Sequence, residues 1–272
     1  MGIDLVVMLG RHYLEKNKEN MINGKKIVVV MPAYNVEQTL EKTFKDLDHD
    51  IIDEVLLSDN ASQDRTVEMA NKLGITVFRH DKNMGYGGNQ KTLYRQALNH
   101  GADIIVMVHP DYQYNPKLAT TMAAMIASGV YDCVLGSRVL VDSPLKGGMP
   151  MWKFISNRFL TGAQNLLYGK RISEYHTGFR AFRREILEKL PLGENSNNYV
   201  FDNQMLSQII HFNYKIGEIS CPAKYFSEAG SANFSQSVVY GTGCMLTAVR
   251  VFLHRRGIIR CPILSENGQK LV

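Results

Sequence analysis

The sequence has few cysteines, and their spacing suggests neither a metal clip nor a disulfide scaffold. Its 272 residues include four of them, and no two are arranged as Cys-x-x-Cys. A chain of this length buries about three quarters of its unfolded surface, so it needs no covalent staples. We therefore expect free thiols and a reducing, cytoplasmic compartment. The four are Cys133, Cys221, Cys244 and Cys261.

Long apolar runs are missing as well. No stretch of about 18 consecutive apolar residues occurs, so we expect no transmembrane helix. The apolar run at residues 5–9 has no basic segment before it, which makes it a poor signal peptide. Val6 stands where a myristoylation motif requires Ser or Thr.

The excess of one charge sign is small. The chain has 31 Lys and Arg against 26 Asp and Glu, which leaves a formal net charge of +5. The basic residues are dispersed and no aromatic platform accompanies them, so the sequence argues against a nucleic-acid partner. A mild positive charge suits anionic small molecules or an anionic membrane surface.

Two periods alternate in what the sequence does contain. Runs rich in β-branched residues predict strands at 27–31, 55–57, 75–78, 104–108 and 133–135. Helical spacing predicts helices at 36–47, 66–73, 89–99 and 118–126. This alternation predicts an α/β fold with a mostly parallel sheet and helices on both faces. Beyond residue 138 the pattern predicts amphipathic helices at 154–167, 201–210 and 238–254, and a short strand at 216–219.

Polar segments follow the predicted strands, where parallel sheets bind ligands. After the first strand, Tyr34 offers a ring face and a hydroxyl, and Asn35 stands at the expected cap of the next helix. After the second, Asp59 and Asn60 can hydrogen-bond a base or ribose. Ordinary turn and capping chemistry is the alternative for both segments.

A glycine-rich segment at 83–89 leads into the third predicted helix. Its glycines allow backbone to approach a ligand, and a helix start favours phosphate, so Gly85 and Asn89 are candidate nucleotide-binding residues. The alternative is a flexible loop. After the fourth strand, Asp111 and Gln113 are oxygen ligands suited to Mg²⁺ or Mn²⁺. His109 is either a further ligand or a hydrogen-bonded structural residue.

Several motifs in this order resemble those of the family 2 glycosyltransferases of GT-A fold, and in particular the dolichyl- or polyprenyl-phosphate sugar synthases. The likeness covers about residues 25–225. The motifs that carry it are Pro32-Ala33-Tyr34-Asn35, residues 59–66, residues 83–89, His109-Pro110-Asp111 with Gln113, Gly136-Ser137-Arg138, and residues 177–185. Two departures are notable: Asn60 and His109 each replace an Asp of the family's motifs.

The resemblance implies an inverting, metal-dependent transfer from a nucleotide-sugar donor (a UDP- or GDP-sugar). Asp111 and Gln113 would hold Mg²⁺ or Mn²⁺ on the diphosphate, and Arg138 would meet a phosphate. Lys153 lies near the place of a further phosphate-binding Arg, and Arg180 belongs to the same acceptor half, with structural pairing as its alternative role. The residues implied at the nucleoside are Pro32, Ala33, Tyr34, Asp59, Asn60 and, near the ribose, Glu37.

The sequence is compatible with two kinds of sugar acceptor and with one non-enzymatic role. A polyprenyl phosphate is favoured, because it is already anionic and needs no base. A growing glycan is the alternative, with Asp202 as the base for a sugar hydroxyl; Asp202 otherwise serves as a helix cap or charge partner. A non-catalytic nucleotide-sugar-binding module is a third hypothesis.

The expected organisation is an N-terminal extension at 1–24, a GT-A domain at 25–225, and a C-terminal amphipathic helix and tail at 226–272. Within the domain, 25–138 forms the nucleotide half and 139–225 the acceptor half. The helices at 154–167 and 238–254 have apolar faces and basic flanks, which suits either a membrane interface or packing. Peripheral contact with the cytoplasmic face of a membrane and homo-oligomerisation are both left open.

Overall fold

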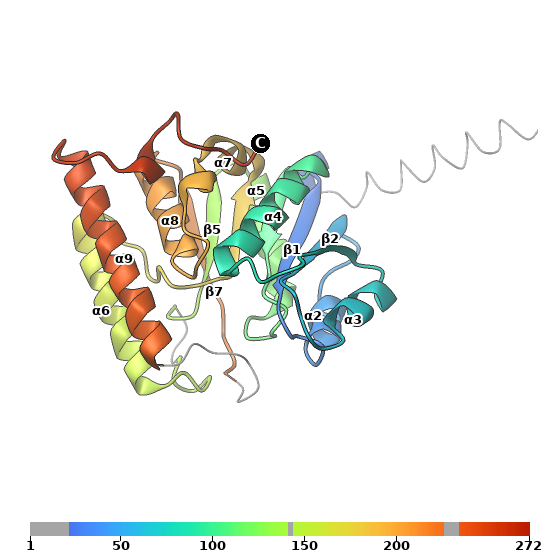
Figure 1. The fold of residues 1–272 in the computed structure, drawn as a ribbon. Helices are drawn as coiled ribbons and strands as arrows, with labels where there is room; N and C mark the ends of the chain where they lie inside the picture. The colour runs from blue at the N-terminus through green and yellow to red at the C-terminus, as the bar shows by residue number, and fades with distance from the viewer. Residues whose placement is uncertain (1–21, 141–143, 226–233) are drawn as a thin grey trace, which may run out of the picture.

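A seven-stranded sheet organises the computed structural model, which describes residues 22–140, 144–225 and 234–272 (Figure 1). The strand order is β3-β2-β1-β4-β6-β5-β7. All neighbouring strands pair in parallel except β6, which runs antiparallel to both β4 and β5. The strands are β1 (Ile27–Ala33), β2 (Glu54–Asp59), β3 (Thr76–Arg79), β4 (Ile104–Met107), β5 (Cys133–Ser137), β6 (Arg180–Arg183) and β7 (Ile216–Ser220).

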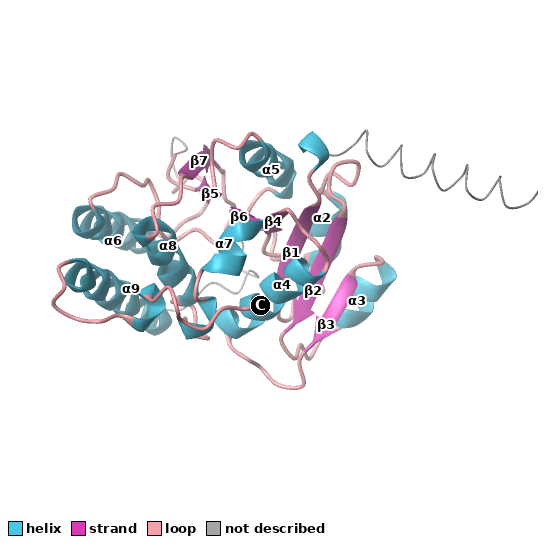
Figure 2. Cartoon of the chain, turned by 90° about the horizontal axis from the view of Figure 1, so that it is seen from above, coloured by secondary structure: helices cyan, strands magenta, loops and turns pink. Residues whose placement is uncertain are grey.

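Helices cover both faces of this sheet (Figure 2). The helices α2, α3 and α5 pack on one face, and α4, α7 and α8 on the other. The long helices α6 and α9 lie side by side beyond α8, as the outermost layer. The bounds are α2 (Leu40–Lys45), α3 (Thr66–Lys72), α4 (Tyr86–Asn99), α5 (Ala119–Ala127), α6 (Met151–Tyr168), α7 (Arg184–Lys189), α8 (Phe201–His211) and α9 (Phe234–Arg255).

The central strand β1 shows why its apolar run is continuous. Val28 and Val30 point into the core beneath α4 and α8, whereas Val29 and Met31 point into the core beneath α2 and α5. All four side chains are fully buried. A strand between two helical layers needs apolar residues on both faces, which is the pattern that the sequence predicts.

The predicted α/β class with a mostly parallel sheet is confirmed, and every predicted strand and helix is present with shifted ends. The antiparallel strand β6 and the helix α7 were not predicted. The helix α4 begins at Tyr86 rather than at residue 89. Of the predicted extension at 1–24, only residues 22–24 lie within the described residues. No helix in the described ranges is both long and apolar enough to cross a membrane.

The expected cap at Asn35 is wrong. Asn35 has a left-handed backbone (φ 53°), and its side-chain oxygen accepts the backbone N–H of Gln63 rather than a helix N–H. The helix α2 begins only at Leu40, after a turn. Asn35 therefore joins the turn after β1 to the turn after β2, and both turns border the site described next.

Candidate active site

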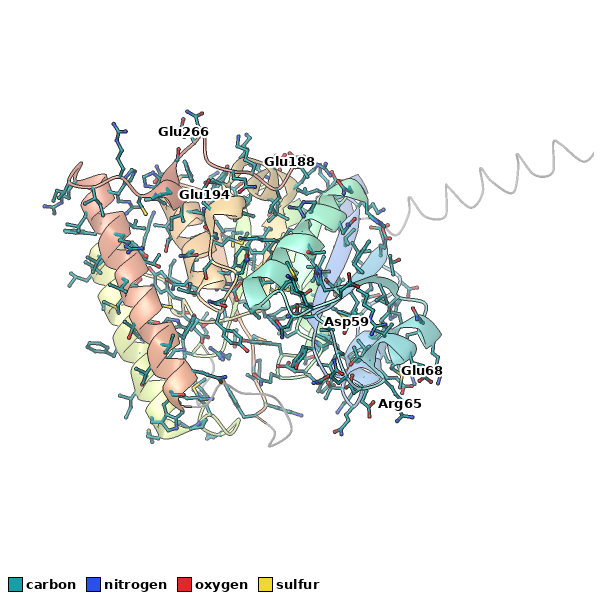
Figure 3. All side chains as sticks on the ribbon, in the orientation of Figure 1. Asp59, Arg65, Glu68, Glu188, Glu194 and Glu266 are labelled. Atoms are coloured by element: carbon teal, nitrogen blue, oxygen red, sulfur yellow. The ribbon has the colours of Figure 1, made fainter. Side chains whose placement is uncertain are left out.

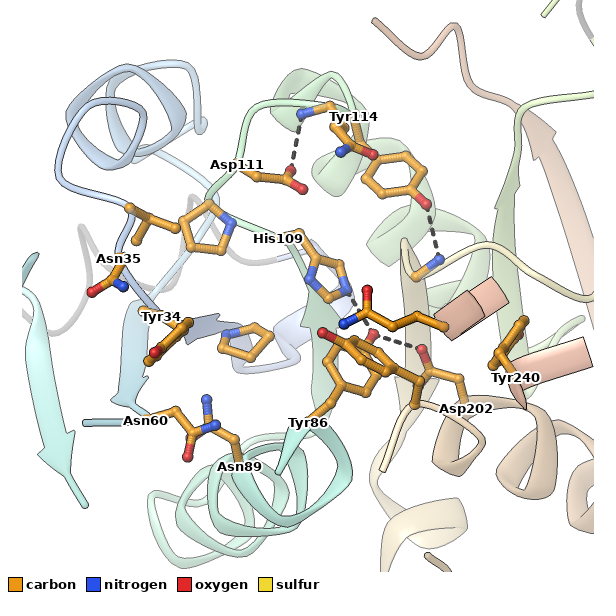
Figure 4. Close-up of a pocket in the computed structure, with 18 of the residues that line it drawn as sticks. Tyr34, Asn35, Asn60, Tyr86, Asn89, His109, Asp111, Tyr114, Asp202 and Tyr240 are labelled. Carbon is orange, nitrogen blue, oxygen red and sulfur yellow. Dashed lines mark hydrogen bonds between the residues drawn. The ribbon is translucent and has the colours of Figure 1, made fainter. Parts of the chain in front are cut away.

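A cavity of about 1300 Å³ opens at the carboxyl ends of β1, β2 and β4 (Figure 4). Its wall includes residues from all four polar segments, together with parts of α6, α8 and α9. Parallel strands end at the same edge of a sheet, which is why segments far apart in the sequence meet here. The predicted site residues that line it are Pro32, Ala33, Tyr34, Glu37, Asn60, Gly85, Asn89, His109, Asp111, Gln113, Arg138, Lys153 and Asp202.

One end of the cavity is built by the turns after β1 and β2. Tyr34 is 51% exposed, so its ring offers an open stacking face. The Asn60 side chain donates to Asn83 Oδ1 (2.9 Å) and accepts the Met84 N–H (2.8 Å). A carboxylate could not make the first bond, because it has no proton to donate. The amide at position 60 thus fixes the glycine-rich segment against β2.

Asp59 does not line the cavity, contrary to the direct nucleoside contact that the family resemblance implies. It lies at the end of β2 with a fully buried side chain (Figure 3). Its carboxylate accepts the backbone N–H of Ser62, and Arg79 Nε lies 3.9 Å away. Asp59 therefore shapes the turn that carries Asn60 into the wall.

The glycines of segment 83–89 serve contacts within the protein. The N–H groups of Gly87 and Gly88, in the first turn of α4, both donate to the Asn197 carbonyl. A Cβ at Gly87 would lie 2.4 Å from the Ser196 carbonyl oxygen. The Gly87 and Gly88 N–H groups are therefore not available to the phosphate that the sequence predicts at this helix start, while Gly85 and Asn89 remain on the cavity wall.

We expect Gly87→Ala to destabilise the protein by about 2–4 kcal/mol, because the added methyl would overlap backbone and the Phe201 side chain. Urea unfolding of the variant measures the change. Gly101→Ala is the control for a glycine replaced without steric overlap, since Gly101 has a positive φ and no neighbour within 4 Å of the added Cβ. A loss at position 87 no larger than at position 101 would contradict the role given to this contact.

At the end of β4, Asp111 and Gln113 stand on the cavity wall. One Asp111 oxygen accepts the Gln113 N–H (3.0 Å), and no Lys or Arg of the described ranges forms an ion pair with this carboxylate. Burial raises the Asp111 pKa, and the nearby His109, the Gln113 N–H and the more distant Arg138 only partly oppose that shift. A desolvated carboxylate without a cation partner is an unusual and costly arrangement, so this is a place for a positive ligand.

His109 belongs to a hydrogen-bonded row with Tyr86 and Asp202 (Figure 4). The Tyr86 hydroxyl donates to Asp202 Oδ2 (2.7 Å) and lies 3.1 Å from His109 Nε2. Since the hydroxyl has one proton, Nε2 of His109 must donate to it, which leaves Nδ1 of the neutral ring as an acceptor. Burial and the Asp202 charge raise the Tyr86 pKa well above its usual range, so this hydroxyl stays protonated.

Asp202 is 7% exposed and lies at the start of α8. Its second oxygen accepts the Gln90 side-chain N–H (3.0 Å). Both carboxylate oxygens therefore already accept a hydrogen bond from the protein. These two bonds hold the Asp202 carboxylate in place on the cavity wall.

Arg138 reaches the cavity from the end of β5 as half of a buried ion pair. Its backbone N–H and its guanidinium both donate to Glu174, and the guanidinium also donates to the Tyr225 hydroxyl and the His176 carbonyl. The Glu174 side chain is fully buried. Burial alone would raise the Glu174 pKa, but the Arg138 charge and its hydrogen bonds outweigh it, so the pKa is lowered.

Lys153 and Arg180 differ in where they lie. Lys153 lines the cavity, and no carboxylate of the described residues pairs with it. Arg180 is buried away from the wall, with its guanidinium donating to the backbone carbonyls of Thr177, Tyr175 and Asp202. The expected contact of Arg180 with an acceptor phosphate is therefore replaced by a structural role beneath α8.

The wall residues that were not singled out from the sequence include three tyrosines, Tyr86, Tyr225 and Tyr240. Tyr86 stands between two glycines, and an aromatic residue in such a glycine-rich loop could have indicated a binding site from the sequence alone. Tyr225 and Tyr240 carry no local signal, since only the fold brings them to Arg138 and His176.

The comparisons with known proteins agree with this geometry. The model of glycosyl transferase family 2 matches residues 28–191. An uncharacterised protein of Methanocaldococcus jannaschii is 30% identical over 78% of this chain and 86% of its own length. A UDP-N-acetylglucosamine–dolichyl-phosphate N-acetylglucosaminyltransferase of Methanococcus voltae is 25% identical over 74% of this chain and 86% of its own length.

Among solved structures, glucosyl-3-phosphoglycerate synthase of Mycobacterium tuberculosis, in complex with uridine diphosphate, aligns with a TM-score of 0.66 and 19% identity. The alignment covers 92% of this chain and 85% of that one. Another structure of the same synthase holds Mn²⁺, uridine diphosphate and phosphoglyceric acid.

The sheet, its helical layers and the structural neighbours define a fold of the GT-A type, and the family match makes the chain a glycosyltransferase of that class. The chain belongs to glycosyl transferase family 2. Within that family it resembles the enzymes that act on dolichyl phosphate.

Proposed function

We propose that this glycosyltransferase moves a sugar from a nucleotide-sugar donor to a polyprenyl phosphate, with inversion at the anomeric carbon. The observation that carries the proposal is that Asp111, Gln113, the open ring of Tyr34 and the cation of Lys153 all line one cavity. An anionic donor, a divalent cation and an anionic acceptor can therefore meet in that cavity. Its volume of about 1300 Å³ suits a nucleotide sugar together with the phosphate end of an acceptor.

The donor nucleoside is assigned to the turns after β1 and β2. The Tyr34 ring would stack on the base, and Pro32, Ala33 and Asn60 would form the rest of its slot. Glu37 lines the same end, with one oxygen held by the Arg65 N–H at 2.7 Å. Gly85 and Asn89 border the slot through their position on the wall.

The residues at the end of β4 fit a divalent ion such as Mg²⁺ or Mn²⁺. Asp111 offers an unpaired, desolvated carboxylate, Gln113 an amide oxygen, and His109 the lone pair of Nδ1. Among the described residues no cluster of three His, Cys, Asp or Glu forms a closed metal site. An open set suits an ion that takes its other ligands from a diphosphate and water. When bound, the ion would offset the charge that develops on the leaving nucleoside diphosphate.

The acceptor phosphate is assigned to the wall formed by Arg138 and Lys153. Arg138 forms an ion pair with Glu174, so among the described residues of the cavity wall Lys153 is the cation left to attract an anion. Burial and the nearby Arg138 lower the Lys153 pKa, and a bound phosphate would restore it. A phosphate oxygen needs no base to attack the anomeric carbon, which agrees with the two hydrogen bonds already made by Asp202.

The test is transfer of sugar from UDP- and GDP-sugars to a polyprenyl phosphate, with Mg²⁺ or Mn²⁺ added, by the full chain. We expect product with one of the donors and a metal requirement. Binding of a nucleotide without transfer to any acceptor and without donor hydrolysis would leave only a nucleotide-sugar-binding module.

A sugar hydroxyl is the second candidate acceptor, because Asp202 lines the cavity. With polyprenyl phosphate as acceptor, we expect Asp202→Asn to lower the rate by less than about tenfold, since no proton has to be removed. Tyr86→Phe is the matched variant, because it removes one hydrogen bond from Asp202 and keeps the carboxylate. A loss above about 10³-fold for Asp202→Asn alone, with Tyr86→Phe active, would identify Asp202 as a base and favour the hydroxyl acceptor.

A further inference from the structure

The outermost helices, α6 and α9, expose apolar side chains along their whole length. On α6 the exposed apolar residues follow helical spacing, and two of them, Phe159 and Leu166, are 72% and 83% exposed. Large apolar side chains are rarely left this open in a contiguous row unless the surface binds something. The exposed apolar residues of α6 are Met151, Trp152, Ile155, Phe159 and Leu166, and those of α9 are Val238, Val239, Leu246 and Val249.

The two rows face the same way. The opposite face of α6 is buried and bonded to the protein body, where Gln164 bonds Asn203 and Tyr168 bonds Ser207. The buried face of α9 carries Cys244, Ala248 and Val251. The helices touch each other at their flanks, since a Cβ at Gly241 would lie 3.3 Å from Leu160. Figures 1 and 2 show them as the outer pair, so their remaining faces form one apolar strip directed away from the sheet.

The charges on this strip have one sign. Neither helix contains an Asp or a Glu, while α6 carries Lys153 and Arg158, and α9 carries Arg250 and Arg255. Arg158, Arg250 and Arg255 are exposed; Arg158 and Arg255 donate to the Ser173 and Tyr168 carbonyls, but none of the three forms an ion pair within the described ranges. An apolar strip flanked by cations without acidic partners is the pattern of a helix pair that lies on anionic lipid.

The same helices form one wall of the cavity. Lys153 and Leu160 of α6 and Tyr240 of α9 line it, so the strip is the outer surface of the wall assigned to the acceptor. We propose that the α6–α9 strip docks on an anionic lipid surface, which places the cavity at the membrane from which a lipid-linked phosphate enters. The link to the acceptor rests on the proposed function, whereas docking itself does not.

A second copy of the chain fits this strip less well than lipid does. In a symmetric pair, an interface patch meets its own copy. The arginines of one strip would then face a strip without a single carboxylate, and like charges across an interface oppose association. Lipid headgroups such as phosphatidylglycerol supply the missing negative charge.

The test is co-sedimentation of the full chain with vesicles of phosphatidylcholine alone, and of phosphatidylcholine and phosphatidylglycerol in equal parts. We expect binding to the mixed vesicles, weakened by salt, and at least about tenfold weaker binding for Phe159→Asp. Arg250→Gln should weaken it about fivefold. Val130→Asp is the matched control, because Val130 is 54% exposed between α5 and β5, away from the strip. Equal binding by all variants, or no binding at all, would overturn the docking surface.

Two further measurements separate docking from the alternatives. Light scattering should find that wild type and Phe159→Asp have the same mass; a dimer that Phe159→Asp dissociates would overturn the lipid assignment in favour of a second copy. Transfer to a short, water-soluble polyprenyl phosphate should be unchanged in Phe159→Asp, while transfer to a long-chain acceptor in vesicles falls. Vesicle binding without transfer to either acceptor would reject the proposed function and leave the docking surface standing.

Discussion

Replacing Asp111 by Asn is expected to lower sugar transfer by about 10³-fold, which is typical of losing one group that stabilises developing charge. The change keeps the shape of the side chain and removes its charge, so a divalent ion loses its only anionic protein ligand in the proposed set. The folded protein should not suffer, because burial already raises the Asp111 pKa and no basic side chain of the described residues pairs with it. We expect equal or slightly higher stability in the variant.

The two measurements are steady-state transfer and the Mn²⁺-dependent rise in the melting temperature with UDP or GDP, since a ligand of the folded state raises that temperature. Asp50→Asn, on an exposed turn, is the matched control and should behave as wild type. A variant that keeps the metal-dependent shift and most of its activity would remove Asp111 from the proposed metal site.

Replacing Glu174 by Gln is expected to cost about 3–5 kcal/mol of folding free energy, the usual effect of breaking a buried ion pair from one side. Glu174 accepts donors from Arg138 and from Asn157, so the change also leaves a buried guanidinium without its counter-charge. The acceptor wall should change as well, because Arg138 becomes free to bind an anion. Urea unfolding at neutral pH measures the stability.

The pH dependence gives this prediction a second readout. The folded-state pKa of Glu174 is lowered from its ordinary value of 4.5, so its contribution is complete above that value and is lost as the pH falls through the folded-state pKa. The stability difference between wild type and Glu174→Gln should therefore shrink in acid. Glu188→Gln is the control, since Glu188 forms a partly exposed pair with Arg184 near the surface (Figure 3) and should cost less than about 1 kcal/mol. Equal losses for the two variants would contradict the role of the buried pair.

The sequence was enough to predict most of the sheet, because five of its strands are continuous apolar runs between helical segments. The strand β6 was missed for a physical reason: it is four residues long and carries Arg180 and Arg183, which mask its apolar residues. Its antiparallel direction is set by pairing with β4 and β5, and no local pattern records the direction of a strand.

The location of the site was predictable from the sequence, since polar residues follow the strands that end at one edge of the sheet. The contacts that those polar residues make were not predictable. Arg138 was expected to meet a phosphate, yet its guanidinium forms an ion pair with Glu174, which lies in another segment of the chain. The glycines at 85–88 were expected to leave room for a ligand, and the room is taken by residues 196–198. Such pairings depend on distances across the fold, which spacing along the chain does not contain.

The contact between the glycine-rich segment and residues 196–198 also bears on how such a chain diverges. Lys91 strengthens it by donating to the carbonyls of Gly193 and Asn195 and to the Asn197 side chain. A side chain at position 87 requires a different path for residues 196–198, and that path leads directly into the helix that bears Asp202. The two segments can therefore change only together, so an altered glycine-rich segment in a descendant enzyme brings an altered approach to α8 with it.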